Sequence, residues 1–394
     1  GPDITLGACS ALADLAEKDC APLLARLIDM HLAEEPVPGR YRVHDLLRLF
    51  AHERAVDEVP EDERTGAVER LVGWYLHSAC AARVALDPHL PPLEPPPAGF
   101  AAATAEFDDK ATALAWYDVE RPNLVAASLS AHGHDLNEHG WKLPIALFPF
   151  FDRRKFFEDW VATHKSGAEC AHLAGDAEAE GKVLCNLGSA YRPMRRFDEA
   201  VECYERAGEL FRTTGWRVGE GKVLGNLAAT YADADQVPEA VTSGLAALDV
   251  FRELDDAWGQ ALCLSNLGNA YARLGAFDDA MRMQAEALDL FRGLEDTRGA
   301  GRAVNGLGTA LARLGRPEDA LVHVKESVDM FAEVGDHHEQ AYALVDLAGV
   351  HTALSQPAQA AHCLRTAGEL FTMLGEHWMV AELRPKLEAA EAGT

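Results

Sequence analysis

The chain has 394 residues, which predicts two or three domains, and with 48% hydrophobic and 25% charged residues it can bury a core. Lys and Arg number 36 against 63 Asp and Glu, a net charge of −27. This charge argues against a surface that lies on nucleic acid or on an anionic membrane, because both require clustered cations.

The cysteines and the hydropathy predict a cytoplasmic protein. No C-x₂₋₄-C pair occurs among the eight cysteines, which argues against a zinc ribbon or a thioredoxin-type motif and is typical of buried thiols in a reducing compartment. No export signal is apparent, and the most apolar stretch, 141–151, is too short to span a membrane. The chain opens at Gly1-Pro2 without Met, as after removal of a tag, so we expect it to be part of a longer polypeptide.

Residues 1–56 are predicted to form a small winged-helix-like domain. Apolar residues at helical spacing predict a helix over 21–32. The sequence AEEPVPGRYRV, residues 33–43, predicts a two-stranded hairpin, and Asp45 is expected to cap the helix that follows. Such a domain would read DNA through basic residues, but nine acidic residues outnumber six basic ones here, so we expect no direct DNA contact.

Residues 57–135 are predicted to be a helical connector. Amphipathic patterns predict helices over 67–84 and 107–129, with Pro122 starting a new helix rather than interrupting one. Between them, six of the 19 prolines lie within residues 88–97, which predicts a stiff loop of polyproline character.

From residue 176 onward the chain repeats every 40 residues, five times, without insertion or deletion. Three positions hold the same residue in all five repeats: Leu187, Leu227, Leu267, Leu307 and Leu347; Ala200, Ala240, Ala280, Ala320 and Ala360; Phe211, Phe251, Phe291, Phe331 and Phe371. Within each repeat the apolar spacing predicts two antiparallel helices, A and B.

Turn residues mark the ends of these helices. Gly275 and Gly315 are expected to end helix A, and Gly175 and Gly335 helix B, in the left-handed conformation. Four aspartates are expected to cap the next helix A: Asp176, Asp256, Asp296 and Asp336. Trp216 takes this place in the second repeat, which we therefore expect to begin differently.

This pattern resembles the tetratricopeptide repeat in a 40-residue form, through Leu184, Leu187, Gly188, Tyr191, Ala200, Tyr204 and Ala207 and their images 40 residues on. The resemblance implies an all-α superhelix (an α-solenoid) over residues 136–394, with a degenerate repeat at 136–175 and five full repeats at 176–375. Residues 376–390 are expected to be a capping helix whose Trp378, Leu383 and Leu387 cover the open end.

The block GRYRVHDLLRLFAHERA, residues 39–55, resembles the winged-helix end of the NB-ARC (STAND-class) ATPase module in AfsR-like, SARP-type transcription activators of actinobacteria. The segments ERLVGWYLHSA and ALAWYDVERPNLVAA are similar to those that join this module to its repeats. The resemblance implies that a DNA-binding domain and a P-loop ATPase, which would bind ADP or ATP, precede these residues in the full-length protein and regulate antibiotic biosynthesis.

Val43-His44-Asp45 matches the Met-His-Asp motif of that family, with Val in the first place. The resemblance implies that His44, next to Asp45, contacts the β-phosphate of ADP and senses the nucleotide state. The alternative is that Asp45 is only a helix N-cap and that His44 packs beside the hairpin.

No motif for catalysis or metal binding is complete. The sequence GWRVGEGKV, residues 215–223, has Trp216 and Val223 where a P-loop needs Gly and Ser or Thr. His338-Glu339 begins an HExxH pattern, but Tyr342 stands at the second histidine. We therefore expect no enzyme activity, no cofactor and no metal in this chain.

In the tetratricopeptide family helix A lines the concave face, which implies a ligand groove there. Asn186, Asn226 and Asn266 share one position beside the core leucine, and an amide can pair with the backbone of an extended peptide as donor and acceptor. The alternative is ordinary helix-surface polarity or a contact between neighbouring repeats. Gly306 and Asp346 take this position in the last two repeats, so the row is expected to stop there.

Basic residues accompany this row and predict an acidic ligand. Lys182, Lys222 and Arg302 share a position in helix A where the helix dipole gives no reason for them. A second set lies near the end of helix A, where the dipole favours cations, and is therefore weaker evidence for a ligand: Arg192, Arg273 and Arg313. The expected partner is a peptide, a protein, a small acidic effector or the ATPase domain of the same chain.

Three function classes remain. The first is the sensor and autoinhibitory module of a nucleotide-gated transcription regulator, the second a general protein-binding scaffold, and the third an enzyme. Only the first accounts for the hairpin, the His44 motif and the repeats together, so it is the predicted function. The coding sequence upstream of Gly1 would distinguish the three classes, because a P-loop and a basic DNA-binding domain there would indicate the regulator.

Overall fold

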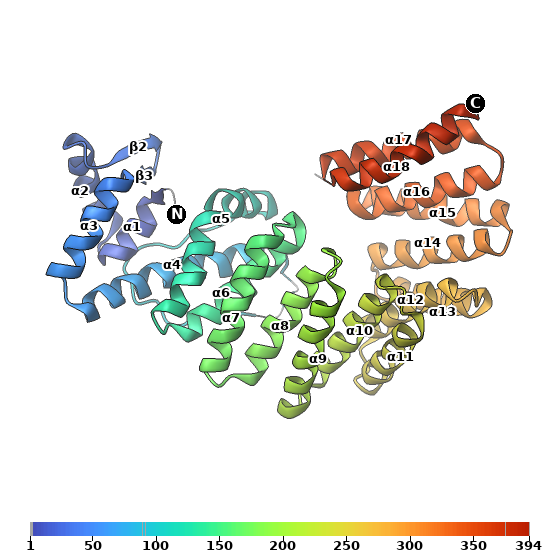
Figure 1. Ribbon diagram of the computed structural model, residues 1–394, viewed down its shortest axis with the longest axis horizontal. Coiled ribbons are helices and arrows are strands. Elements are labelled where there is room, and N and C mark those ends of the chain that lie inside the picture. Colours follow the sequence, from blue (N-terminus) through green and yellow to red (C-terminus); the bar gives the residue numbers. More distant parts are fainter. Residues whose placement is uncertain (1–2, 89, 91, 375, 394) are drawn as a thin grey trace. The chain divides into compact units, whose positions relative to one another are not determined.

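The computed structural model describes residues 3–88, 90, 92–374 and 376–393, and these form 18 helices and three short strands (Figure 1). The all-α class is confirmed. The chain divides into two compact parts, the N-terminal unit Gly1–Trp216 and the C-terminal unit Arg217–Thr394, and each is described by itself. The domain boundaries predicted at residues 56 and 135 fall inside the N-terminal unit, and Gly1-Pro2 lies outside the described residues.

A winged-helix domain opens the N-terminal unit. Its elements are β1 (Ile4–Thr5), α1 (Leu6–Ala13), α2 (Glu17–Asp29), β2 (Glu34–Val37), β3 (Arg40–Arg42) and α3 (Asp45–Glu58). The N-terminal residues add a third strand to the predicted hairpin, so the antiparallel sheet has the order β1-β3-β2. In β1, Ile4 pairs with Tyr41 and Thr5 with Arg40, and the Thr5 hydroxyl then caps α1.

Two long helices, α4 (Glu61–Leu86) and α5 (Lys110–Gly133), form the connector. The prediction that Pro122 starts a new helix is wrong, because α5 runs through it. Pro122 is exposed, whereas Glu120 and Asn123 are buried on either side of it. Packing of the flanking residues therefore keeps the helix continuous although one backbone hydrogen bond is lost.

The proline-rich stretch has no helix or strand where it is described, and His89 and Pro91 lie outside the described residues. The carbonyl oxygen of Pro96 is 2.8 Å from Nε2 of His77 on α4. The carbonyl oxygen of Glu94 accepts a 2.6 Å hydrogen bond from Lys142 on the next helix, α6 (Asn137–Arg154). These contacts hold the stretch against the connector.

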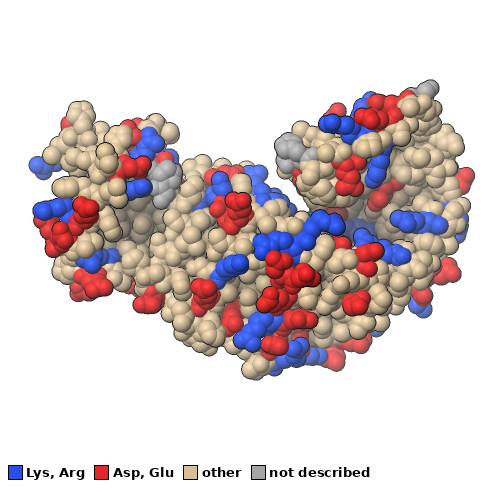
Figure 2. Space-filling model, viewed as in Figure 1, with Lys and Arg blue, Asp and Glu red and all other residues tan. Residues whose placement is uncertain are grey.

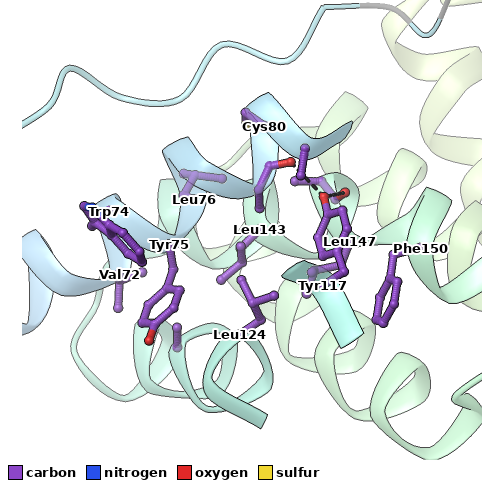
Figure 3. Close-up of a cluster of buried hydrophobic side chains, with 14 of the residues drawn as sticks. Val72, Trp74, Tyr75, Leu76, Cys80, Tyr117, Leu124, Leu143, Leu147 and Phe150 are labelled. Atoms are coloured by element: carbon purple, nitrogen blue, oxygen red, sulfur yellow. Dashed lines mark hydrogen bonds between the residues drawn. The ribbon is translucent and has the colours of Figure 1, made fainter. Parts of the chain in front are cut away.

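The core of the N-terminal unit joins α4 and α5 to α6 (Asn137–Arg154) (Figure 3). Leu76, Leu124 and Leu143, one from each helix, are completely buried. The Tyr117 hydroxyl lies within 3.0 Å of carbonyl oxygens of both α4 and α6. The connector and the first helix pair therefore share one core, which explains why they belong to one compact unit.

The rest of the chain consists of helix pairs at the predicted 40-residue period. Continuing from α6, the helices are α7 (Phe157–Leu173), α8 (Ala177–Tyr191), α9 (Phe197–Thr214), α10 (Arg217–Asp233), α11 (Val237–Glu253), α12 (Ala257–Arg273), α13 (Phe277–Gly293), α14 (Thr297–Arg313), α15 (Pro317–Glu333), α16 (His337–Ala353), α17 (Pro357–Met373) and α18 (His377–Ala392). Helices α8, α10, α12, α14 and α16 are the A helices. In the described part of the chain, no helix is both long and apolar enough to cross a membrane.

Glycines and phenylalanines of the repeat determine how these helices pack. A Cβ atom at Gly188 would lie 2.8 Å from the Tyr204 ring, so glycine lets α8 and α9 approach closely. Phe251, at the end of α11, fills the space between two successive A helices. A Cβ atom at Gly221, on α10, would lie 2.9 Å from the Phe251 ring, and one at Gly259, on α12, would lie 2.4 Å from it. Phe251 therefore joins its own repeat to the next.

The predicted caps are confirmed. Gly175, Gly275, Gly315 and Gly335 have φ between 69° and 77°, the left-handed region that favours glycine. The four predicted aspartates each accept a backbone N–H three residues on. At the place of the missing aspartate, Trp216 packs edge-on against Phe211 with ring centroids 4.6 Å apart.

The last helix, α18, packs on the C-terminal unit partly as predicted. Leu383 is buried and Leu387 is half-buried beside it, but Trp378 is 62% exposed and the prediction that it covers the end is wrong. Met379 takes the inward place, because residues 379, 383 and 387 lie on one helical face. Glu388 occupies the position that holds Gly or Ala in every full repeat, so a helix B could not approach α18 as closely there. Gly375, the end of the fifth predicted repeat, lies outside the described residues.

Candidate nucleotide contact and ligand-binding faces

The predicted nucleotide contact lies at the start of α3. The helix begins at Asp45, so the prediction that Asp45 is the N-cap is wrong; His44 holds that position and makes no side-chain cap bond. Asp45 lies in the first turn, where its charge suits the helix dipole, and pairs with Arg48 at 3.0 Å. His44 Nε2 is 3.7 Å from Glu34 Oε2 on β2, and the His44 side chain is 66% exposed. His44 thus lies beside the wing and is accessible to a partner.

Two helices of the winged-helix domain expose apolar side chains. No residue of α3 is buried, and Leu46, Leu49 and Phe50 are each at least 61% exposed. Leu23 on α2 and Met30, the C-cap residue that follows α2, are more than half exposed. We call these five residues the α2–α3 face. So many exposed apolar residues on one small domain are typical of an interaction surface.

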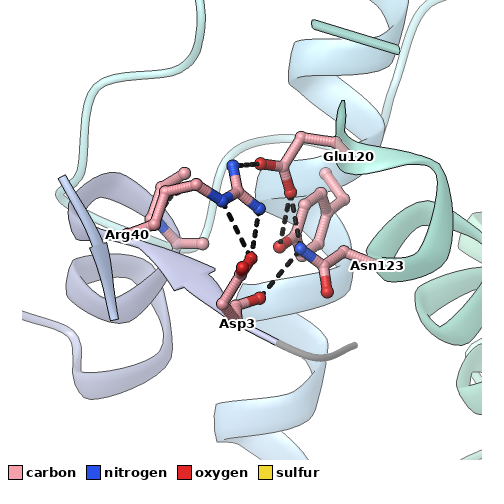
Figure 4. Close-up of polar contacts among 7 residues, drawn as sticks. Asp3, Arg40, Glu120 and Asn123 are labelled. Atoms are coloured by element: carbon pink, nitrogen blue, oxygen red, sulfur yellow. Dashed lines mark hydrogen bonds and ion pairs between the residues drawn. The ribbon is translucent and has the colours of Figure 1, made fainter. Parts of the chain in front are cut away.

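A polar cluster joins the wing to the connector (Figure 4). Arg40 on β3 donates from Nε to Asp3 Oδ1 at 2.8 Å and from Nη1 to Glu120 Oε1 on α5. Glu120 is only 1% exposed, and its second oxygen accepts from Asn123 Nδ2 at 2.7 Å and from the Tyr75 hydroxyl at 3.3 Å. Burial, and next the charge of Glu120, raise the pKa of Tyr75.

This cluster could not be found from spacing, because its charged partners Arg40 and Glu120 are 80 residues apart. A cavity of about 380 Å³ lies beside it, lined by Tyr41 of β3, Leu71 of α4 and Asn123 of α5 among other residues. The winged helix is therefore attached to the connector by the packing of α1 on α4 and by these polar contacts, next to an incompletely filled seam.

Three of the predicted groove residues lie in the N-terminal unit. Lys182 on α8 pairs with Glu178 at 2.6 Å, and its Nζ is 4.9 Å from the centroid of the Trp216 ring. The positive charge of Lys182 is thus partly neutralised within this unit. Asn186 is half-buried one turn further on, and Arg192 follows the last residue of α8.

The other six lie in the C-terminal unit. Asn226 and Asn266 are half-buried on α10 and α12, and Lys222 is exposed. Arg302 Nε is 3.9 Å from Glu339 Oε1. Arg273 donates to a carbonyl group in the last turn of α10, which is the helix-end role that the dipole favours, and Arg313 is exposed.

A helices line one side of the C-terminal unit. Helix α12 packs against both α10 and α14, and α14 against α16, so the A helices form a continuous row. On this row a Cβ atom at Gly225 or Gly349 would meet no atom within 4 Å, so both glycines face open space. Burial and a set of acidic charges that includes Asp233 of α10 raise the pKa of Tyr342 on α16 to about 12. We call the side of this row on which Gly225 and Gly349 face open space the inner face.

Structure explains both departures from the asparagine row. A Cβ atom at Gly306 would lie 2.3 Å from the amide of Gln284, which reaches between α12 and α14, so any side chain here would displace that amide. Asp346 accepts a 2.7 Å hydrogen bond from Asn305 Nδ2, one residue before Gly306, and burial raises the pKa of Asp346. Sequence reasoning missed Gln284 and Asn305, although Gln284 stands where other repeats have Tyr, Gly, Val or Leu.

Acidic and basic side chains are intermingled over the face shown in Figure 2. Among the described residues, no three His, Cys, Asp or Glu side chains gather as a metal site would require. All eight cysteines are free, and six of them are buried.

Comparisons with known proteins agree with the repeat pattern. The tetratricopeptide repeat family matches residues 181–213, 220–293 and 300–373. The regulatory protein AfsR of Streptomyces griseus is 31% identical over 207 residues, which is 51% of this chain and 20% of that protein. AfsR of Streptomyces coelicolor is 30% identical over 214 residues, 51% of this chain and 21% of that protein. The chain thus spans about a fifth of the length of these relatives.

Solved structures share the helical-repeat fold. A Rap protein complexed with Competence and Sporulation Factor has a TM-score of 0.50 at 15% identity, covering 82% of this chain and 97% of that one. A STAND protein with a tetratricopeptide repeat sensor from Pyrococcus horikoshii has a TM-score of 0.49 at 14% identity, covering 99% of this chain and 60% of that one. These likenesses concern the fold alone. The AfsR matches carry the relationship: the chain is homologous to AfsR regulatory proteins over half its length, and it contains tetratricopeptide repeats.

Proposed function

We propose that this chain is the sensor and ligand-interaction part of a nucleotide-gated transcriptional activator of secondary metabolism. In this proposal the repeats control an ATPase and a DNA-binding part that lie outside the chain, and the chain itself is cytoplasmic and not an enzyme. The observation that carries the proposal is homology to AfsR regulatory proteins over half of the chain, together with repeats that the tetratricopeptide family matches.

His44 is proposed to contact the nucleotide of the ATPase part. Its imidazole is 66% exposed and stands at the N-terminus of α3, a place that favours an anion. The neighbouring Glu34 disfavours a phosphate here unless a cation accompanies it. The residues present therefore fit a nucleotide through one contact only, and ADP or ATP would be bound chiefly by groups of the missing part.

The α2–α3 face is proposed to be covered by the same ATPase part. Five large apolar side chains that are more than half exposed on one domain favour a permanent partner, because in water they would promote aggregation. They lie on the domain that carries His44, so an ATPase part seated on them would also be brought to the nucleotide contact. This gives the winged helix a coupling role rather than a DNA-reading one.

The inner face of the repeats is proposed to bind an acidic peptide, protein segment or small effector. Lys222 is exposed on α10, and Arg302 has only a distant carboxylate at 3.9 Å. The same fold is seen in the Rap protein that is complexed with Competence and Sporulation Factor, and it is compatible with such a role.

The test is a His44→Ala substitution in the complete gene product, with His52→Ala as control, because His52 is exposed on the same helix. We expect His44→Ala to retain less ADP through purification and to raise transcription from the target promoter without effector. His52→Ala should behave as the unchanged protein. If His44→Ala and His52→Ala are indistinguishable, His44 is no nucleotide contact. If removing residues 1–394 leaves transcription unchanged, the chain is a general scaffold.

A further inference from the structure

The strongest unassigned feature is a pair of hydrogen-bonded chains that run from buried B-helix residues to the inner face of the C-terminal unit. One chain consists of Gln284 and Asn269, the other of Ser327, Asn305 and Asp346. In each case a polar residue replaces the apolar one that most repeats place in the core. The inference drawn from them rests on the proposed function of the inner face.

Gln284 on α13 is 1% exposed, at a position held by Tyr204, Val324 and Leu364 in other repeats. Its Nε2 donates to the backbone carbonyl of Ser265 at 2.9 Å and to Asn269 Oδ1 at 2.8 Å. Its Oε1 is buried and has no partner among the described residues. A buried carbonyl without a partner is costly, so packing alone gives no reason for glutamine here.

This arrangement fixes the orientation of the Asn269 amide. A backbone carbonyl can only accept, so the Ser265 carbonyl sets Gln284 Nε2 on the side of Asn269. Asn269 must then turn Oδ1 inward to accept, and its Nδ2 is left to donate outward from α12. Asn269 is exposed on this helix. The result is an oriented donor on the inner face.

Room for the Gln284 amide is provided by two glycines. A Cβ atom at Gly268 would lie 2.7 Å from Gln284 Nε2, and one at Gly306 would lie 2.3 Å from it. Any side chain at either position would displace the amide. The glutamine and both glycines therefore form one arrangement.

The second chain ends in an oriented acceptor. Ser327 stands where the other four repeats have alanine. Its hydroxyl donates to the Val324 carbonyl oxygen at 2.8 Å and lies 3.2 Å from Asn305 Oδ1. Asn305 Nδ2 donates to Asp346 Oδ2 at 2.7 Å. The other oxygen of Asp346, Oδ1, has no hydrogen-bond partner in the described part of the chain. Asp346 is half-buried on α16 and is left as an acceptor.

We infer that the inner face selects the chain direction of an extended peptide, with Asn269 binding a peptide carbonyl and Asp346 a peptide N–H. Gln284 is the positioning residue that holds the Asn269 contact in this role. Neighbouring helices lie about 10 Å apart, so α12 and α16 are separated by about 20 Å, or about six extended residues. The positive charges of Arg313 and Lys386 act on Asp346, which favours a neutral N–H over an ammonium group.

The test begins with selection of random acidic peptides of about twelve residues on the whole 394-residue chain. The best binder is synthesised in its own order and in reversed order, which keeps composition and charge but inverts the direction of the backbone. Binding is measured to the unchanged chain, to Gln284→Leu and to Gln260→Leu. Leucine is chosen because Leu364 occupies the equivalent position in the fifth repeat. Gln260 on α12 is the matched control, because its side chain donates to the Phe251 carbonyl oxygen.

We expect the unchanged chain to prefer one order at least about fivefold, the effect of one oriented hydrogen bond. Gln284→Leu should abolish most of this preference without lowering the melting temperature, since it removes a buried carbonyl. Gln260→Leu should retain the preference. A merely structural role of Gln284 would change stability or affinity and leave the preference for one direction intact.

Three results would overturn the inference. Equal binding of both orders to the unchanged chain, or an intact preference in Gln284→Leu, would show that Gln284 sets no direction. If Lys222→Glu still lowers the affinity for the selected peptide in either case, the inner face is the binding site and only the inference fails. If no peptide is enriched, the proposed function of the inner face fails together with the inference.

Discussion

His164 is a completely buried histidine in the middle of α7, packed against the rings of Phe151 and Trp160. Its Nδ1 lies 3.0 Å from the Trp160 carbonyl oxygen, whereas Nε2 is buried without a partner among the described residues. Burial lowers the pKa of His164 to about 3. Folding therefore requires the neutral imidazole.

The N-terminal unit should lose stability in acid because of this one residue. Between pH 6.5, where an unfolded histidine titrates, and pH 3 the unfolded chain binds a proton that the folded chain excludes, so stability falls as the pH falls. His164 should contribute about 3 kcal/mol of this loss between pH 7 and pH 4. Urea unfolding of His164→Gln at several pH values should show a flatter dependence, while the exposed His52→Gln keeps the original one. An unchanged slope in His164→Gln would contradict the assignment.

Arg40 should contribute far more than Arg42 to the stability of the N-terminal unit, although both lie on β3. Arg40→Met leaves the Glu120 carboxylate buried without its cation, which should destabilise the N-terminal unit by about 3–5 kcal/mol. Arg42→Met breaks a pair with Glu34 that is about half exposed and should cost less than about 1 kcal/mol. Adding Glu120→Gln to Arg40→Met should recover a large part of the loss. Equal unfolding midpoints for the two methionine variants would show that the cluster does not hold the wing.

At the scale of the elements, successive repeats are linked by the same carboxylates that cap their helices. Asp296 accepts the Gly299 N–H with Oδ1 and the Trp258 Nε1–H with Oδ2 at 3.1 Å. Asp336 likewise caps α16 with Oδ1 and pairs with Arg298 at 2.5 Å through Oδ2. Each residue therefore stabilises its own helix and joins it to the preceding repeat.

Substitutions at Asp336 should separate these two contributions. Asp336→Asn keeps an oxygen for the cap but weakens the pair with Arg298, at a cost of about 0.5 kcal/mol. Asp336→Ala loses both and should cost about 1.5 kcal/mol. Asp256→Asn is the control, because no partner of its Oδ2 occurs among the described residues and the change should cost almost nothing. Denaturant melts of the three variants measure these differences, and equal losses in both asparagine variants would exclude the link.

Sequence alone was sufficient where a feature depends on neighbours along the chain, and insufficient where it depends on packing. The caps at Asp176 and Gly275 follow from local backbone geometry, and the period of 40 places every core phenylalanine. Pro122 failed as a helix start because buried residues on both sides keep α5 continuous. Gln284 was missed because its partners come from another helix, although a polar residue in an apolar register was a usable signal.

At the scale of the whole molecule, a net charge of −27 repels an acidic ligand, so binding to the inner face requires local cations. Affinity for the selected acidic peptide should therefore fall as salt rises from about 50 to about 300 mM, since screening weakens the local attraction. Lys222→Glu should reduce affinity about tenfold and Asn226→Ala less. Lys325→Glu, on helix B α15, has the same charge change and should have little effect. If affinity, measured by fluorescence anisotropy, survives all of these changes, the ligand binds elsewhere.

Glu388 also bears on what happens when two molecules meet end to end. A repeat array grows by adding identical modules, and the exposed end of such an array is a natural template for a second molecule, which would lead to open-ended fibres. At the end formed by α18 a carboxylate stands where Gly188 and its images let backbones touch, so continued stacking would bury an unpaired charge. Glu388 thus disfavours such stacking on α18, and Glu388→Gly should promote self-association of the chain through this helix.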